Sequence, residues 1–200
     1  MKTLSYRKGW AFILTIAMAF TTMFGGFGFL GINGMVGEVY AAPIASTLDL
    51  TAMPSQDNIL TDGWAWDSST STLTLSGINL STASANALIV PTNTAIVLVG
   101  DNYVESTQSS GNYSYGLYAV NGLTISGSGT LTVTGGSIDS GFSTYGMYVD
   151  KGSTTINNGT VTASGGTALG FNGRSYGIYH TGWTLTINGG TVTATGGTAS

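Results

Sequence analysis

The chain has 200 residues, a formal net charge of −4 and no cysteine, and only 7% of its residues are charged. The lack of cysteine excludes a disulfide framework. No basic stripe with interleaved aromatic residues is present, which argues against nucleic acid as a partner.

The first 41 residues have the pattern of an export signal. They open on three basic residues, Lys2, Arg7 and Lys8. The segment from Trp10 to Phe24 is almost wholly apolar, and small residues suited to cleavage follow at Ala41 and Ala42. We therefore expect residues 1–41 to be a Gram-positive-like signal peptide and the mature protein to be secreted or held at the cell surface. An uncleaved membrane anchor is the alternative, and we expect membrane contact only through this signal.

Residues 42–62 are polar without a clear period, so we expect a flexible, extended lead-in there. The fold is expected to begin with the Gly-Trp-Ala-Trp-Asp run at residues 63–67, followed by an alternating strand at 73–80. The ends of a solenoid expose strand edges and core unless they are capped. We therefore interpret Trp64 and Trp66 as part of an N-terminal cap.

A unit of about 30 residues is then repeated between Tyr115 and Ser200. The units open on Tyr-Gly-Leu-Tyr at 115–118, Tyr-Gly-Met-Tyr at 145–148 and Tyr-Gly-Ile-Tyr at 176–179. They close on Gly-Thr runs at 129–136, 159–166 and 190–197. A less regular copy of the unit precedes them. Its segment 87–90 corresponds to segment 116–119 and lies 29 positions earlier (116 − 87), close to the period of the later units. Self-similarity at this period predicts a repeat architecture.

Each Gly-Thr run alternates apolar and hydroxyl residues, which predicts a strand with one buried face, and the glycine pair at its end predicts a sharp corner. Such a strand is not stable alone but can pair with its copy one repeat later. We therefore expect an all-β fold, a right-handed parallel β-helix with about four to five turns over residues 63–200. An antiparallel sandwich also has short strands, but it does not explain the fixed period.

Three segments carry a resemblance to a known family. The Gly-Trp-Ala-Trp-Asp run, the Leu-Thr-Leu-Ser-Gly run and the recurring Tyr-Gly-Ile-Tyr, Leu-Thr-Ile and Gly-Gly-Thr-Val-Thr-Ala-Thr-Gly-Gly segments resemble the β-helix repeats of secreted Gram-positive surface proteins. The resemblance implies a fold similar to the pectate-lyase-like superfamily. Because some such repeats are described as carbohydrate-binding, it also implies a polysaccharide or cell-wall glycan as a partner. The chain stops in mid-unit without a visible cap, so we interpret it as part of a longer repetitive protein.

Repetition places equivalent residues above one another. By the parity of the strand, three apolar residues are expected to point inward: Leu117, Met147 and Ile178. Tyr118, Tyr148 and Tyr179 would then form an outward column of rings. A tyrosine offers a flat apolar face and a hydroxyl, which suit a sugar ring. Three rings predict weak binding, with a Kd of about millimolar to tens of micromolar. Alternatively, the rings stack on one another only to stabilise the coil.

Two further columns have structural interpretations. Outward Thr-x-Thr motifs recur at 130–132, 160–162 and 191–193. They resemble the ice-binding face of some antifreeze proteins, but we favour ordinary β-propensity on a solvated strand. Asn157 and Asn188 occupy equivalent corners and predict an internal asparagine ladder.

Catalysis has weaker support in the sequence. A glycoside hydrolase needs two carboxylates facing across the scissile bond, whereas Asp139 and Asp150 are expected in separate loops. A lyase would need calcium-binding acids and a base, and only Lys151 and Arg174 remain as basic residues after the signal. His180 occupies a strand position that is apolar in the earlier units, and one histidine without cysteine does not make a zinc site.

These patterns predict a non-catalytic, monomeric surface module, without cofactor or metal, that acts in adhesion or display. Its expected carbohydrate-binding residues are Tyr118, Tyr148 and Tyr179. Two alternatives stay open. One is a polysaccharide-degrading enzyme whose active site lies in divergent loops or beyond residue 200, and the other is a structural stalk.

Overall fold

The computed structural model describes residues 43–200, so the expected signal peptide lies outside the described residues. These residues form strands joined by tight corners, with one short helix, α2 (Ile59–Asp62). No helix within residues 43–200 is long and apolar enough to cross a membrane.

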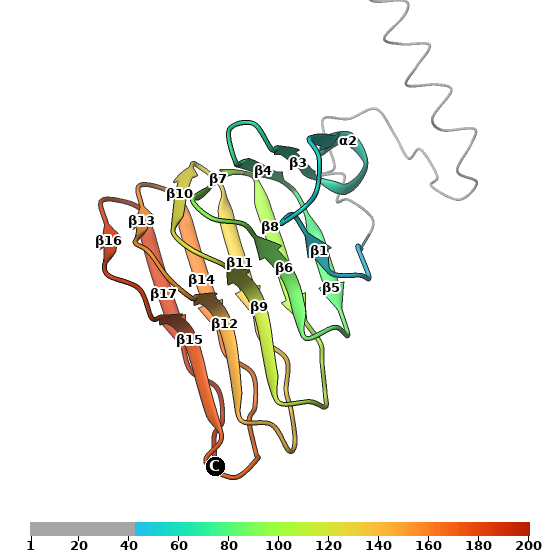
Figure 1. The fold of residues 1–200 in the computed structure, drawn as a ribbon, viewed down its shortest axis with the longest axis vertical. Coiled ribbons are helices and arrows are strands. Elements are labelled where there is room, and N and C mark those ends of the chain that lie inside the picture. Colours follow the sequence, from blue (N-terminus) through green and yellow to red (C-terminus); the bar gives the residue numbers. More distant parts are fainter. Residues whose placement is uncertain (1–42) are drawn as a thin grey trace, which may run out of the picture. The chain divides into compact units, whose positions relative to one another are not determined.

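The strands form three sheets, which Figure 1 shows along one coil. The first sheet contains β1 (Leu48–Asp49), β6 (Asn86–Val90), β9 (Tyr113–Ala119), β12 (Ser143–Val149) and β15 (Arg174–His180), in that order. The second sheet runs β16 (Leu185–Ile187), β13 (Thr154–Ile156), β10 (Leu123–Gly127), β7 (Thr94–Val99), β4 (Thr72–Ser76), β3 (Trp64–Asp67), β2 (Gln56–Asn58). The third sheet runs β17 (Thr191–Thr195), β14 (Thr160–Ser164), β11 (Thr130–Thr134), β8 (Asp101–Ser106), β5 (Asn79–Thr82).

Each turn of the chain visits the three sheets in the same order, and strands one turn apart pair in parallel. In the first sheet, for example, Leu117 pairs with Met147, and Met147 pairs with Ile178. Four full turns follow one another from β6 to β17, after an incomplete first turn. The parallel β-helix predicted from the repeat is confirmed, and the antiparallel sandwich is wrong.

The interior of the coil consists of stacked apolar side chains, because alternate residues of each strand point inward. One position of the second sheet is isoleucine in four successive turns: Ile96, Ile125, Ile156 and Ile187. The first three are fully buried, whereas Ile187 in the last turn is 51% exposed. Burying an isoleucine side chain stabilises a fold by roughly 1.5–3 kcal/mol, so this stack is a principal source of stability.

Residues 43–62 differ from the expected extended lead-in. Ile44 bridges to Leu80, and Leu48 in β1 pairs in parallel with Leu88 in β6. Leu48 and Leu50 are buried, so this segment completes the core at that end of the coil. The parallel strand has only two residues, which is too short for a periodic pattern to be recognised.

An antiparallel pair covers the edge of the second sheet at the same end. Strand β2 pairs with β3, and β3 pairs with β4, both antiparallel. Trp64 and Trp66 in β3 are buried, and the Trp66 Nε1–H donates a hydrogen bond to the carbonyl oxygen of Met53 at 3.0 Å. The two tryptophans therefore lie in the element that caps the sheet edge.

A buried asparagine forms hydrogen bonds to backbone groups at the first corners of the coil. Asn102 in β8 is fully buried at a position that becomes Leu131 in the next turn. Its Oδ1 accepts hydrogen bonds from the backbone N–H groups of Gly77 at 2.9 Å and Ile78 at 3.2 Å. Its Nδ2 donates to the carbonyl oxygen of Thr130 at 2.9 Å. The amide thus satisfies backbone groups that the corner leaves without ladder partners.

Replacing Asn102 with leucine is expected to lower the free energy of unfolding by about 2–4 kcal/mol, because buried N–H groups lose their acceptor. Urea denaturation followed by circular dichroism measures the change. The control is Asn157→Leu at a half-buried corner outside the core, where we expect a loss below about 1 kcal/mol. Equal losses in the two variants would contradict the role assigned to Asn102.

Candidate functional site

The three tyrosines expected to form a column lie in register on β9, β12 and β15 of the first sheet. The ring centroids of Tyr118 and Tyr148 are 5.4 Å apart with an interplanar angle of 6°. Those of Tyr148 and Tyr179 are 5.6 Å apart at 12°. The rings stand outside the core and are partly buried. Of the residues expected to point inward, Leu117 and Met147 are fully buried and Ile178 packs against the core.

A second column of tyrosines, which the sequence analysis missed, lies beside the first. It consists of Tyr115, Tyr145 and Tyr176, also in register. The ring centroids are 5.0 Å apart between Tyr115 and Tyr145 and 5.4 Å apart between Tyr145 and Tyr176, with interplanar angles of 6° and 7°. Strict alternation would have turned these residues inward, with the parity of Leu117.

In β9, β12 and β15, the glycine of the Tyr-Gly-x-Tyr motif interrupts the regular alternation of inward and outward side chains. Gly116 and Leu117 are consecutive buried residues, so the tyrosines on both sides of this pair face outward. A Cβ atom at Gly116 would lie 2.7 Å from the Gly146 carbonyl oxygen and 2.8 Å from the Thr134 nitrogen. The backbone of the third sheet passes so close that only glycine fits. The recurring Tyr-Gly-x-Tyr motif is the sequence feature from which the second column could have been predicted.

The two columns interlock through their ring edges. Across the columns, the centroids of Tyr145 and Tyr148 are 5.0 Å apart with an interplanar angle of 72°. Rings thus stack face to face along a column and meet edge to face between columns, and aromatic pairs favour both arrangements. We call the six residues the tyrosine array: Tyr115, Tyr118, Tyr145, Tyr148, Tyr176 and Tyr179.

Stacking determines which part of each ring a ligand can reach. In the column of Tyr118, Tyr148 and Tyr179, only the middle ring, Tyr148, is stacked on both faces, whereas Tyr118 and Tyr179 each have one stacked face. The middle ring of the other column, Tyr145, is also stacked on both faces and is buried. The expectation that all flat faces of Tyr118, Tyr148 and Tyr179 are free to meet a sugar is therefore too simple, because stacking covers part of them. Carbohydrate binding at these residues stays a prediction.

Burial keeps several tyrosines of the array neutral at alkaline pH. Desolvation is the largest cause that raises the pKa of Tyr115, Tyr118 and Tyr145 above its usual value near 10. The pKa of Tyr148 is raised to about 12, first by burial and then by the negative charge of Asp150. A buried phenol stays protonated because its anion loses hydration.

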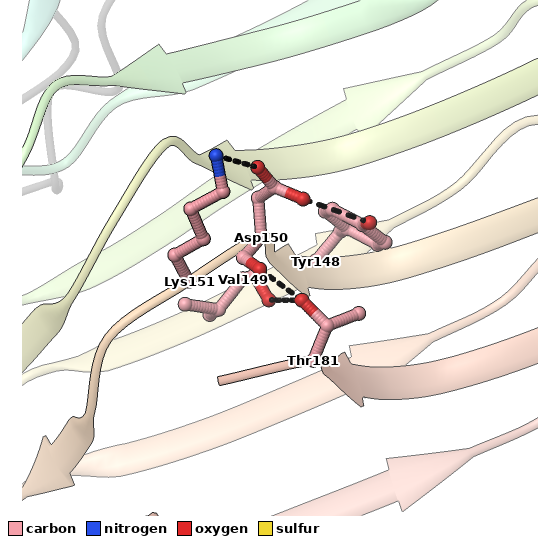
Figure 2. Close-up of polar contacts among 5 residues, drawn as sticks. All are labelled: Tyr148, Val149, Asp150, Lys151 and Thr181. Carbon is pink, nitrogen blue, oxygen red and sulfur yellow. Dashed lines mark hydrogen bonds and ion pairs between the residues drawn. The ribbon is translucent and has the colours of Figure 1, made fainter. Parts of the chain in front are cut away.

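Asp150 links the array to the corner that follows β12, as Figure 2 shows. The Tyr148 hydroxyl donates a hydrogen bond to Asp150 Oδ1 at 3.3 Å, and Lys151 Nζ lies 3.7 Å from Asp150 Oδ2. The Lys151 side chain is 75% exposed, so this ion pair contributes only about 0–1 kcal/mol. The Thr181 hydroxyl of the next turn donates to the carbonyl oxygens of Val149 and Asp150.

The two carboxylates considered for catalysis lie at opposite ends of one strand, and in the described part of the chain only Asp150 has a basic partner, Lys151. Asp139 lies in the segment between β11 and β12, whereas Asp150 follows β12. Arg174 begins β15 and is exposed. Within residues 43–200, no group of three or more His, Cys, Asp and Glu side chains could hold a metal ion. His180 pairs with Val149 in register, as expected, and its Nε2 is buried without a hydrogen-bond partner.

The threonine and asparagine columns are present with two differences. The Thr-x-Thr motifs stack in register across three turns, but the equivalent β8 positions are Asp101 and Tyr103. The asparagine ladder is confirmed, since Asn188 Nδ2 donates to Asn157 Oδ1 at 2.9 Å. It lies outside the core rather than inside the coil, with Asn157 half-buried and Asn188 exposed, because Asn157 follows the inward-pointing Ile156 and so points outward.

Raising the pH from 10 to 12 is expected to destabilise the fold. In this window the unfolded tyrosines ionise, while Tyr148 in the folded chain keeps its proton until a pKa of about 12. The unfolded state therefore binds fewer protons than the folded state, and the free energy of unfolding falls as the pH rises. Urea midpoints measured across this range test the prediction. Tyr148→Phe should show a smaller decrease, and an identical decrease in both proteins would contradict it.

Comparison with known proteins agrees with the coil. The model of the family described as Beta helix repeat matches residues 155–178 and 185–200, which lie in the last two turns. Neither the curated proteins nor the solved structures gave a significant match. Together with the in-register parallel sheets, the matched repeat identifies the chain as a parallel β-helix protein.

Proposed function

We propose that the chain is an exported, non-catalytic surface module, of the kind found in Gram-positive bacteria, that acts in adhesion or display. Its ligand is a polysaccharide or cell-wall glycan, held weakly at the tyrosine array. The observation that carries this proposal is the pair of in-register tyrosine columns on the outside of the first sheet. Export rests on the basic and apolar pattern of residues 1–41.

The geometry of the array favours contact through edges and hydroxyls. A neutral tyrosine hydroxyl both donates and accepts hydrogen bonds, as sugar hydroxyls do. The Tyr148 hydroxyl already donates its hydrogen to Asp150, so it is left to accept a hydrogen bond from a sugar. A linear glycan laid along the coil would meet an equivalent group in each turn. Each contact is weak, so we expect useful affinity through multivalency, with a Kd of about millimolar to tens of micromolar for one module.

A structural stalk is the second candidate, and the stacking itself favours it. Each stacked or edge-to-face pair contributes about 0.5–1.5 kcal/mol beyond its buried area, so the array stabilises the coil without any ligand.

A polysaccharide-degrading enzyme has less support, because Asp139 and Asp150 lie at opposite ends of β12. We further propose that the chain is a monomer. We also propose that it does not bind nucleic acid, because residues 43–200 contain eight acidic residues and only two basic ones.

Retention of the full chain on a panel of insoluble polysaccharides tests the proposal. A variant with Tyr118, Tyr148 and Tyr179 all replaced by phenylalanine keeps the stacked rings and removes the hydroxyls. We expect it to fold normally and bind at least about tenfold more weakly, because three hydrogen bonds of about 0.5–1.5 kcal/mol each are lost.

The corresponding triple alanine variant is the second arm, with circular dichroism as the folding control. It should lose both retention and stability. If the wild-type chain is retained by no polysaccharide while the alanine variant loses stability, the stalk is the better account.

A further inference from the structure

A hollow of about 260 Å³ lies at the corners that join the first sheet to the second. It is lined by Asn121, Lys151, Gly152, Thr181, Gly182 and Trp183. It adjoins the tyrosine array, because Asp150, the hydrogen-bond partner of Tyr148, directly precedes Lys151.

The hollow arises where the repeat changes length. Ala119 pairs with Val149 and Leu123 pairs with Thr154, so three residues (120–122) form the corner after β9 and four (150–153) form the corner after β12. The corner after β15 also has four residues (181–184). The strands keep their register on both sides, and the corners therefore absorb the extra residue.

The backbone that carries Trp183 is held firmly. The Trp183 N–H donates to the carbonyl oxygen of Gly152 at 2.8 Å, and the Thr184 hydroxyl bonds to the Ser153 hydroxyl at 2.9 Å. The Thr181 hydroxyl donates to the carbonyl oxygen of Asp150 (Figure 2). A side chain on such a fixed backbone loses less freedom when a ligand binds.

The indole of Trp183 differs from the tyrosines of the array, each of which has at least one face stacked on another ring. Its side chain is 87% exposed, and it stacks on no other aromatic ring among residues 43–200. An exposed indole face packs well against an apolar surface while its N–H can still bond to a polar group. The C–H face of a sugar ring is a surface of this kind.

The polar groups around the hollow suit an uncharged ligand. No protein group in the described part of the chain bonds the side-chain amide of Asn121, so its donor and acceptor are open. The charge of Lys151 is balanced by Asp150 at 3.7 Å. Because residues 43–200 also carry an excess of acidic side chains, an anionic ligand would be repelled.

We propose that this hollow is a binding subsite for one uncharged sugar ring of a polysaccharide. Trp183 packs on the C–H face of the ring, and Asn121 and Lys151 bond to its hydroxyls. The volume lies just below that of pockets for drug-sized ligands, as expected for a single ring. The inference rests on the proposed function and deepens it, because it adds a subsite with an open ring face next to the tyrosine array.

Tryptophan fluorescence of the full chain, compared with that of Trp183→Ala, reports on this subsite, because Trp64 and Trp66 are buried and Trp10 lies in the expected signal peptide. The probes are soluble oligomers of glucose, mannose and N-acetylglucosamine, with oligogalacturonate as the anionic comparison. We expect a saturable signal with at least one neutral probe and none with oligogalacturonate. Trp183→Ala should abolish the signal and weaken retention on the matching insoluble polymer at least about tenfold. Asn121→Ala should weaken binding several-fold.

The matched control is Phe171→Ala, since Phe171 is also 87% exposed but lies in the loop before β15. This variant should bind as the wild-type chain does, and circular dichroism confirms that each variant folds. Unchanged polymer retention in Trp183→Ala, with retention still lost in the tyrosine variants, would overturn the subsite and leave the proposed function in place. Preferential binding of oligogalacturonate would overturn the uncharged ligand. Failure of the wild-type chain to bind any polymer or oligomer would overturn both proposals.

Discussion

The in-register pairing of each strand with its copy one turn later is the constraint on which the rest of this protein depends. When parallel strands of successive repeats pair in register, equivalent residues lie directly above one another. A residue that recurs in the repeat therefore forms a column along the coil. The isoleucines of the second sheet stack inside for this reason, and the tyrosines of the first sheet stack outside. Since the chain has no disulfide, these ladders and columns supply its stability.

The tyrosine array shows how a column can serve the fold and a surface together. Stacking stabilises neighbouring turns, but it also covers both faces of Tyr148 and one face each of Tyr118 and Tyr179. What the array leaves to solvent is a row of edges and hydroxyls, which favours weak, repeated contacts. Trp183 has the opposite character, with an open face on a fixed corner. A repeated aromatic surface and a single exposed indole therefore occur on the same coil.

The sequence was sufficient to predict the architecture but only part of the candidate site. The period predicted the parallel coil and the inward positions of Leu117 and Met147, because repetition reveals parity. It missed the outward Tyr115, since the parity change at Gly116 depends on a close approach by the third sheet. It also missed the pairing of Leu48, because two paired residues carry no pattern. Contacts between distant segments decide both cases, and no local pattern reports them.

The change in corner length has a consequence for how such repeats diverge. Copies of a duplicated unit must keep their inward residues and strand lengths, or the ladders on both sides lose register. A corner can change its length without disturbing the pairing of the strands. The corner after β9 has three residues and the corner after β12 has four, yet the strands on both sides stay in register. New side chains can therefore accumulate at this corner at little cost to the coil. Differences between turns are therefore expected to gather at this corner, while the sheets keep the residues that stack in register.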